Sequence, residues 1–414
     1  MCRLLEAQVR RLRKGHTFKV VVVGGSIGKT STKLAIANTL QASHRVRYQD
    51  GNYNDRLTVP LVLFGQIEPG IFNIFAWAKI LFQNEQTIRK NFAVDFAVLE
   101  IGTDGPGQIA EFAYLQPELA IITAITPEHM EFFQDLDAVA AEELEVAKFA
   151  KQLLVNSDDT LEKYLTDLHY VSYGFGAHST YRATDLKKNG LAGQSATFDL
   201  HGLKIPVELT VLGEQGAKIA LSAAAAADIL GLPEQEIIAG LKNVGSAPGR
   251  MQILPGIKNS TLIDDTYNAS PAAVKAALNV LYSTDAPQRI AILGSMNELG
   301  DYSQAAHEEV GSYCDTTKLD AVVTIGQMAN DFLAPAAESK GCKVEKFVNP
   351  YDAASFVSSL LKDGAVVLAK GSQNGVFAEE ALKPLLLNPE DASRLVRQSP
   401  NWLSKKAKQF SKSL

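Results

Sequence analysis

Apolar runs alternate with segments of helical periodicity along most of this chain. In the first half the runs lie at 20–23, 94–102, 119–125 and 153–155, and a further strand is expected at 44–48. Strands that are apolar along their whole length are typical of parallel sheets covered by helices on both faces. The pattern therefore predicts an α/β fold built on a parallel sheet.

The pattern changes between about 170 and 212. Short alternating segments there, such as 195–200 and 205–211, are typical of antiparallel strands and predict a small antiparallel β insertion on the first sheet. Helices are expected at 216–230 and 233–241. The glycine- and proline-rich stretch 245–249 then indicates a domain boundary.

Strand–helix alternation resumes after this boundary and predicts a second, smaller, Rossmann-like α/β domain. Its strands are expected at 261–264, 289–293, 321–325, 344–347 and 365–368. Asp264-Asp265 and Lys370-Gly371-Ser372 follow two of them, at the sheet edge where parallel α/β domains place their ligands.

Composition narrows the class of protein. At 414 residues the chain is too long for one ordinary core, and its net charge of -6 argues against a general nucleic-acid binder. Cys2, Cys314 and Cys342 are widely spaced and odd in number, which suits a reducing cytoplasm and provides no metal-ligand spacing. The start lacks the apolar core of a secretion signal, so a cytoplasmic protein is expected.

Three segments have both basic and apolar character. The basic ends, 1–17 and 396–414, predict solvated and partly frayed termini, with a weak contact to anionic membrane as the alternative. The apolar segment 70–82 is too short to span a bilayer. It predicts a helix that covers the core or a substrate-side groove, and interfacial attachment is the alternative.

A glycine-rich stretch follows the first apolar run directly. It reads Gly25-Ser26-Ile27-Gly28-Lys29-Thr30-Ser31, but Val23 stands where the strict phosphate-loop pattern has its first glycine. Backbone N–H groups, a helix N-terminus, the Lys29 ammonium and the Thr30 hydroxyl together suit a phosphate with its magnesium ion. The alternative is a plain strand-to-helix turn.

Further polar residues lie near strand ends. Glu100 ends a buried strand, where a carboxylate suits magnesium, and an N-cap or surface acid is the alternative. His129 follows the next strand and is either a site residue or an ordinary core or surface histidine. Asn52 and Asn54 either line a site or satisfy a turn.

Several stretches together resemble one family, the Mur ligases of peptidoglycan synthesis. They are most similar to the MurF type, which joins D-alanyl-D-alanine to a UDP-N-acetylmuramoyl-tripeptide. The pieces occur in family order, and the most specific are IDDTYNASP (263–271) followed by LGSMNELG (293–300). The others are GGSIGKTSTK (24–33), GNYNDRLTVPL (51–61), VLEIGTDGPGQIAEF (98–112), ITPEHMEFF (125–133), PGR (248–250) and AKGSQNGVF (369–377).

The resemblance implies an ATP-binding P-loop domain at 18–245 and a C-terminal α/β domain at 246–395. It implies that ATP is held by Gly25, Ser26, Ile27, Gly28, Lys29, Thr30, Ser31, Arg250, Asp264, Tyr267 and Asn268. Substrate would contact Asn52, Asn54, Lys370 and Ser372. Magnesium would be bound by Thr30, Glu100, His129 and Glu143, and the catalytic set would be Lys29, Glu100, His129 and Glu143.

The chain departs from the family in four places. Only about 17 residues precede the nucleotide domain, so the family's N-terminal UDP-sugar domain is expected to be absent. Glu143 aligns with the family's carbamylated lysine; it either takes over as a metal ligand or belongs to a solvated helix face. The stretch 215–219 replaces the family's adenine-side run, and Ser295 replaces an aspartate.

The resemblance implies an ATP-dependent amide ligase that proceeds through an acyl phosphate. ATP and magnesium are the expected cofactors, and a muramyl peptide and D-alanyl-D-alanine or a similar amine are the expected substrates. Two alternatives stay open: the same fold acting on a lipid-linked or other non-UDP acceptor, and a non-catalytic nucleotide-binding relative. No nucleic-acid partner is expected, and the sequence does not indicate an oligomeric state.

Overall fold

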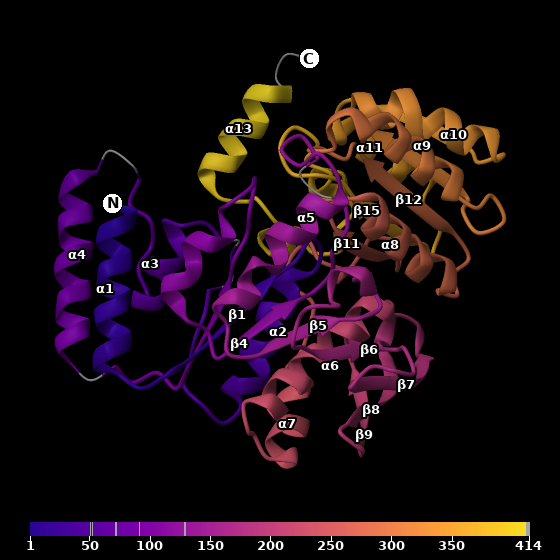
Figure 1. Cartoon of the computed structure of the whole chain (residues 1–414). Coiled ribbons are helices and arrows are strands. Elements are labelled where there is room, and N and C mark those ends of the chain that lie inside the picture. Colours follow the sequence, from indigo (N-terminus) through magenta and orange to yellow (C-terminus); the bar gives the residue numbers. More distant parts are fainter. Residues whose placement is uncertain (50, 52, 71–72, 91, 128–129, 411–414) are drawn as a thin grey trace. The chain divides into compact units, whose positions relative to one another are not determined.

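The fold was analysed in a computed structural model that describes residues 1–49, 51, 53–70, 73–90, 92–127 and 130–410. The chain forms two compact units (Figure 1). The first comprises Met1–Lys187, Ser195–Leu209 and Gln215–Gly245, and the second comprises Lys188–Gln194, Thr210–Glu214 and Ser246–Leu414. The predicted α/β fold is confirmed in both units.

The first unit contains a nine-stranded sheet in the order β2-β3-β1-β4-β5-β6-β7-β8-β9. The strands from β2 to β7 pair in parallel. Their bounds are β1 Lys19–Gly24, β2 Val46–Arg47, β3 Phe96–Glu100, β4 Leu119–Ile122, β5 Leu153–Asn156, β6 Val171–Gly174, β7 Tyr181–Lys188, β8 Gln194–Leu200 and β9 Leu203–Leu209. The predicted insertion therefore continues the main sheet, and the two residues between β8 and β9 permit only an antiparallel hairpin.

Alternating side chains of these strands pack against helices on the two sheet faces. One face, with Val20 and Val22, packs against α1 (Cys2–Gly15), α3 (Thr58–Phe64), η1 (Ile109–Leu115) and α5 (Leu136–Glu143). Helix α2 (Lys29–Gln41) contacts β1 and β3 and crosses α7 (Glu234–Leu241). That crossing requires Gly240, because a Cβ there would lie 2.3 Å from the backbone oxygen of Thr39. The alanine-rich helix α6 (Gly213–Ile229) is buried along most of its length.

The second unit contains a six-stranded sheet in the order β10-β11-β15-β12-β13-β14. All pairs are parallel except β10–β11. The strands are β10 Gln252–Pro255, β11 Thr261–Asp265, β12 Arg289–Gly294, β13 Ala321–Ile325, β14 Val344–Phe347 and β15 Val366–Lys370. One face packs against α8 (Pro271–Ser283), α9 (Ser303–Tyr313) and α10 (Ala334–Ser339), and the other against α11 (Pro350–Leu360) and α12 (Glu379–Leu382).

The expectation of frayed termini is wrong for both described ends. Helix α1 buries Leu5, Val9 and Leu12 completely. Near the other end, helix α13 (Pro400–Phe410) buries Lys406 and Phe410. Tertiary neighbours thus cover apolar side chains of α1 and both an aromatic and a charged side chain of α13, and these contacts offset the entropy of ordering the chain.

The apolar segment predicted at 70–82 is a helix, but the helix α4 runs from Ile74 to Arg89. Its inner side packs through Trp77 and Ile80 against Leu5 of α1 and Leu61 of α3. Its side chains at Ile74, Phe75 and Phe82 are exposed, so the helix covers the core with only one of its faces.

Candidate functional site

The phosphate-type loop of the first unit lies between β1 and α2. Gly25 has φ of +110°, and a Cβ there would lie 2.6 Å from Thr123 Oγ1 and 2.8 Å from the Ala124 oxygen. Only glycine therefore lets the loop approach the end of β4 this closely. The Ser26 amide donates to the Ala124 oxygen at 2.8 Å, and its hydroxyl donates to the Thr126 oxygen at 3.0 Å.

Helix α2 begins directly after this loop. Its N-cap is Gly28, with φ of 87°, which provides no side chain to cap the first turn. The first-turn N–H groups and the helix dipole make such a terminus suited to an anion. Lys29 is the first helical residue and is partly exposed, as are Ile27 and Ser31. Their contact with ATP stays a prediction.

Thr30 and Glu100 come together, as expected for two residues predicted to share a magnesium ion. Glu100 ends β3, where it is in register with Val23 of β1. Because α2 follows β1 after the glycine loop, this register brings the carboxylate beside Thr30 at the start of α2. The Thr30 hydroxyl donates to Glu100 Oε1 at 3.1 Å, and both residues are buried. The alternative of a surface acid is therefore wrong for Glu100, which is 2% exposed.

Lys33, for which no role was predicted from the sequence, belongs to the same group of residues. Its ammonium lies 3.2 Å from Glu100 Oε2 and donates to the Gly51 oxygen at 2.7 Å. Both side chains are almost fully buried, so the lysine neutralises a carboxylate that would otherwise be costly to desolvate. The signal was present in the sequence: Lys33 follows Lys29 by one helical turn, on the same side of the helix.

Glu143 lies against the phosphate-type loop. Its Oε2 accepts a hydrogen bond from the Gly25 amide at 2.7 Å, and the residue is 3% exposed. The neighbouring Glu142 accepts from the amides of Gly107 and Ile109 at 2.6 and 2.7 Å. The alternative of a solvated helix face is therefore wrong for both acids, because α5 points them into the unit. A metal-binding role for Glu143 stays a prediction.

Asn54 packs close to the end of β3. Its backbone oxygen accepts from the Gly102 amide at 2.9 Å, and a Cβ at Gly102 would lie 2.4 Å from Asn54 Nδ2. The loop that carries Asn54 is thus anchored beside Glu100. Asn52 and His129 lie outside the described residues, so their predicted roles are not described by the structure.

The stretch that replaces the family's adenine-side run bonds within the first unit. The Lys218 ammonium lies 2.8 Å from Asp159 Oδ2, and Gln215 Nε2 donates to the same oxygen at 3.4 Å. Asn156 Nδ2 also donates to it, at 2.7 Å. One carboxylate therefore collects three donors from the end of β5 and the start of α6.

The second unit brings its own predicted residues together at the carboxyl ends of β11 and β15. Asp265 and Lys370 are in register, and their side chains form a buried ion pair of 2.6 Å. Lys370 also donates to the Asn268 oxygen at 2.9 Å. The Ser372 hydroxyl is 1% exposed and accepts from the Asn297 amide at 2.9 Å. Both residues support the loops around them, and their direct contact with substrate stays a prediction.

Arg250 and Tyr267 stack at the same edge. The guanidinium carbon lies 4.2 Å from the centre of the tyrosine ring, a cation–π geometry. The Tyr267 amide donates to the Gly249 oxygen at 3.0 Å, which holds the two loops together. This pair presents a planar cationic surface of the kind that suits a nucleotide base or phosphate.

The loop after β12 is held by a histidine that the sequence argument did not single out. His307 is fully buried; its Nε2 accepts from the Met296 amide at 2.9 Å, and its Nδ1 lies 2.7 Å from the Ser303 oxygen. Burial lowers the pKa of His307, which favours the neutral ring that this accepting role requires. Ser295, where the family has an acid, accepts from the Ala329 amide at 3.1 Å.

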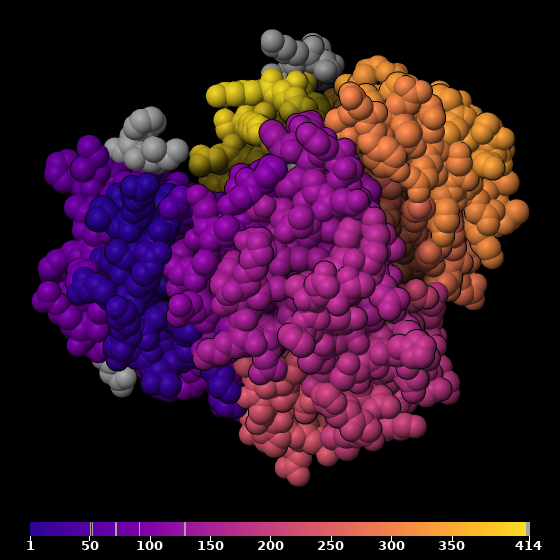
Figure 2. Space-filling model, in the orientation of Figure 1, coloured from indigo at the N-terminus to yellow at the C-terminus, as the bar shows by residue number. Residues whose placement is uncertain are grey.

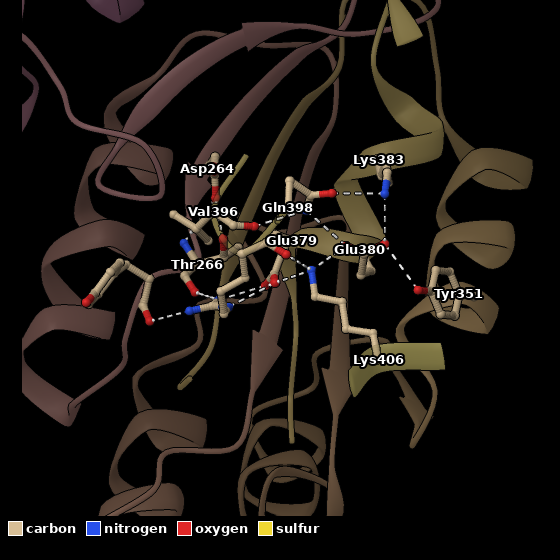
Figure 3. A network of polar contacts seen from close by, with 11 residues as sticks. Asp264, Thr266, Tyr351, Glu379, Glu380, Lys383, Val396, Gln398 and Lys406 are labelled. Carbon is tan, nitrogen blue, oxygen red and sulfur yellow. Dashed lines mark hydrogen bonds and ion pairs between the residues drawn. The ribbon is translucent and has the colours of Figure 1, made fainter. Parts of the chain in front are cut away.

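A buried ionic cluster supports the end of β11, which carries Asp264, and the loop that follows it (Figure 3). Arg397 binds Glu379 at 2.7 Å and donates to the backbone oxygens of Thr266 and Tyr267 at 2.5 and 3.0 Å. Lys406 of α13 binds Glu379 at 2.8 Å and Glu380 at 2.6 Å. Through Arg397, the C-terminal segment therefore holds the backbone of the loop at Thr266 and Tyr267.

Asp264 lies fully buried beside this cluster. Its Oδ1 accepts from the Thr266 amide and hydroxyl at 3.1 and 2.5 Å, and its Oδ2 has no hydrogen-bond partner within the described part of the chain. Burial raises the pKa of Asp264 to about 6, and the nearby Glu379 and Asp265 carboxylates add to this rise. The charged form is therefore costly to the fold.

We expect Asp264→Asn to stabilise the second unit at neutral pH. In the wild type the folded pKa of about 6 exceeds the ordinary 3.8, so stability falls as the pH rises between these values. The variant lacks this fall, because the amide keeps the acceptor without the charge. Thermal unfolding should show a gain of about 3 kcal/mol at pH 7 that disappears near pH 4.

The exposed Asp301→Asn serves as the control for this prediction and should change stability by less than about 0.5 kcal/mol at either pH. A difference between wild type and Asp264→Asn that does not depend on pH would contradict the argument.

The chain is similar to known proteins along most of its length. The Mur ligase middle domain model matches residues 78–227, and the model of the Mur ligase, glutamate ligase domain matches 249–373. UDP-N-acetylmuramoyl-tripeptide–D-alanyl-D-alanine ligase of Haemophilus influenzae is 30% identical over 383 residues, covering 88% of this chain and 76% of the relative. The Bacillus subtilis ligase of the same name is 27% identical over 378 residues, covering 90% and 76%.

Solved structures agree with this likeness at the level of the fold. The crystal structure of MurF ligase from Thermotoga maritima in complex with ADP superposes with a TM-score of 0.75 at 23% identity. The superposition covers 94% of this chain and 84% of that one. No helix within the described residues has the length and apolar character needed to cross a membrane.

Proposed function

The chain belongs to the Mur ligase family, and from this premise we propose that it is an ATP-dependent ligase for peptidoglycan precursors. The proposed reaction joins the carboxylate of a muramyl peptide to D-alanyl-D-alanine or a similar amine. The relatives that carry this activity in their names match about nine-tenths of the chain. We place the reaction in the cytoplasm, where the three free cysteines would stay reduced.

The contact of Thr30 with Glu100 beside the glycine loop carries the proposal. A phosphate loop alone indicates nucleotide binding, whereas the hydroxyl and carboxylate beside it suit the divalent cation that accompanies ATP. Both are hard oxygen donors, and magnesium is usually held by one or two carboxylates together with phosphates and water. Glu100 Oε2 is ion-paired with Lys33 at 3.2 Å, so the oxygen proposed to face magnesium is Oε1, which lies beside the Thr30 hydroxyl.

The residues of the chain act by position and charge. Lys29 and the first-turn amides of α2 would bind the phosphates and offset the negative charge that develops on the transferred phosphoryl group. Thr30 and Glu100 would hold magnesium, which supplies further charge neutralisation when bound. The acceptor carboxylate attacks the γ-phosphorus to give an acyl phosphate and ADP. The amine then attacks the acyl carbon, and inorganic phosphate leaves as the amide forms.

The test measures release of ADP and phosphate when ATP is supplied with an acceptor and D-alanyl-D-alanine. UDP-linked and lipid-linked muramyl tripeptides are compared as acceptors, and the peptide product is identified by mass. We expect release that requires both acyl and amine substrates. If ATP binds but no acyl and amine pair stimulates turnover, the chain is a non-catalytic nucleotide-binding relative and the proposal fails.

Glu143 is proposed to take part in magnesium binding. Glu143→Gln keeps an acceptor for the Gly25 amide and removes only the charge, so it separates a metal role from a structural one. We expect the magnesium concentration for half-maximal rate to rise about tenfold or more, while the melting temperature changes little. The control is Glu145→Gln, whose carboxylate pairs with the exposed Lys148. An unchanged magnesium dependence would restrict Glu143 to holding the loop.

A further inference from the structure

Helices α1 and α4 form a pair at the outer surface of the first unit (Figures 1 and 2). They run parallel, because contacts advance along both in step: Leu5 packs on Trp77 and Ile80, and Gln8 Nε2 donates to the Leu81 oxygen at 2.9 Å. Further along, Arg11 binds Glu85 at 2.6 Å. The N-terminal turns of the two helices therefore lie at the same end of the pair.

Large apolar side chains are exposed on this pair. Phe75 is 91% exposed and Phe82 is 64% exposed, and both lie on the side of α4 that faces away from α1. Ile74 is 77% exposed and, on α1, Leu4 is 56% exposed, both in the first turns. Exposed aromatic side chains do not gain the free energy of burial. A cluster of them therefore indicates a surface that a binding partner or a membrane covers when the protein functions.

Basic side chains accompany these apolar ones. On α4, Lys79 and Arg89 are exposed and follow the same spacing as Phe75 and Phe82, so all four share one helix face. Together α1 and α4 contain seven basic and two acidic residues, although the whole chain has a net charge of -6. The surface is therefore a local concentration of positive charge on an acidic protein.

Both acidic residues of the pair are already neutralised. Glu6 is buried and binds Arg56 at 2.5 Å, and Glu85 binds Arg11. Along the described helices α1 and α4, the exposed charged side chains without an ion-pair partner among the described residues are basic, and they include Arg3 and Lys14 on α1. A second copy of the chain would bring like charges together across a twofold axis, which disfavours self-association through this surface.

From the combination of exposed aromatic and basic side chains we infer that the α1–α4 surface binds the headgroup region of an anionic lipid bilayer. The basic residues attract phosphate headgroups, and Ile74, Phe75 and Phe82 enter the interface between headgroups and acyl chains. Helix α4 has 16 residues, and its inner face packs on α1 through Trp77 and Ile80. It would therefore lie along the bilayer surface and would not span the bilayer. The inference goes beyond the ligase activity and is independent of it.

Vesicle flotation with the full chain tests this inference. Vesicles of phosphatidylcholine with about one-third phosphatidylglycerol are compared with pure phosphatidylcholine, at low and high salt. We expect binding to the anionic vesicles only, weakened by salt because exposed charges are screened. Phe75→Ser with Phe82→Ser, and separately Lys79→Glu with Arg89→Glu, should each lower the bound fraction about tenfold or more.

The matched control carries Lys340→Glu and Lys343→Glu, two exposed lysines of the second unit, and should bind like the wild type. Melting temperatures and turnover on water-soluble substrates should stay unchanged in all three variants, since every substituted side chain is exposed. Wild-type binding that does not differ between the two vesicle compositions would overturn the inference. So would retained binding in the Phe75/Phe82 variant, or a dimer in sedimentation velocity that the same variant abolishes.

Discussion

Lys29→Ala is expected to lower ATP-dependent ligation by a factor of about 10³, with the fold retained. Lys29 is the first residue of α2 and directly follows the glycine loop, so its charge belongs to the same segment as the first-turn amides. Charge on the transferred phosphoryl group would lose this neutralisation in the transition state. Alanine is a good helix former and the side chain is partly exposed, so the helix itself should persist.

The measurement is phosphate release at saturating ATP, together with the melting temperature. Lys340→Ala removes an exposed lysine far along the sequence in the second unit and serves as the control, with wild-type turnover expected. Turnover of Lys29→Ala within about tenfold of the wild type would place the phosphates away from the glycine loop. A lowered melting temperature would instead point to a structural role for this lysine.

Lys406→Ala is expected to destabilise the second unit by about 3 to 5 kcal/mol. The ammonium is 1% exposed and lies between two buried carboxylates, Glu379 and Glu380 (Figure 3). Without it these charges are only partly neutralised, by Arg397 and by the more exposed Lys383. Thermal or denaturant unfolding measures the loss, and a second, lower transition is expected if the two units unfold separately.

Lys405→Ala is the matched control, because the neighbouring lysine is exposed and contacts Asn374 and Trp402 at the surface. Its cost should stay below about 0.5 kcal/mol. Pairing Lys406→Met with Glu380→Gln should recover part of the loss, since both charges leave together. Equal effects of Lys405→Ala and Lys406→Ala would show that the cluster contributes no more than a surface ion pair.

The same cluster has a defined pH dependence. Burial opposes ionisation of Glu380, but the hydrogen bonds from Lys406 and Gln398 outweigh it and lower its pKa. A carboxylate with a lowered folded pKa stabilises the protein above its ordinary value of 4.5. This contribution is lost as the pH falls through the folded pKa, so the difference between wild type and Lys406→Met should shrink in acid.

The order of strands and helices followed from local patterns and is confirmed in both units. Apolar runs such as 20–23 and 321–325 became β1 and β13, because a strand buried on both faces needs apolar side chains throughout. The short β10 was not predicted, since four residues with one proline present little pattern. The family resemblance agrees with the relatives named above, and the Thermotoga maritima structure was solved in complex with ADP.

The candidate site was predictable only in part. The glycine loop and Glu100 could be predicted from their positions in the sequence, because each follows or ends a parallel strand at the edge where such sheets bind ligands. The roles of Lys33, His307 and Arg397 could not be predicted in this way, since these roles depend on partners elsewhere in the sequence. Lys33, for example, is one of many lysines until β3 brings Glu100 to 3.2 Å from its ammonium.

The sequence by itself determined the α/β class, the two sheets, the phosphate-type loop and the family, because each depends on residues that are neighbours along the chain. Only the tertiary structure decided which charges are buried and with whom. It ruled out the solvated helix face for Glu143, which accepts from the Gly25 amide, and it placed Lys406 of the basic tail in a buried ionic cluster. Burial and ion pairing depend on contacts between segments that are distant in sequence, and the local periodicity of a segment does not specify which distant segment packs against it.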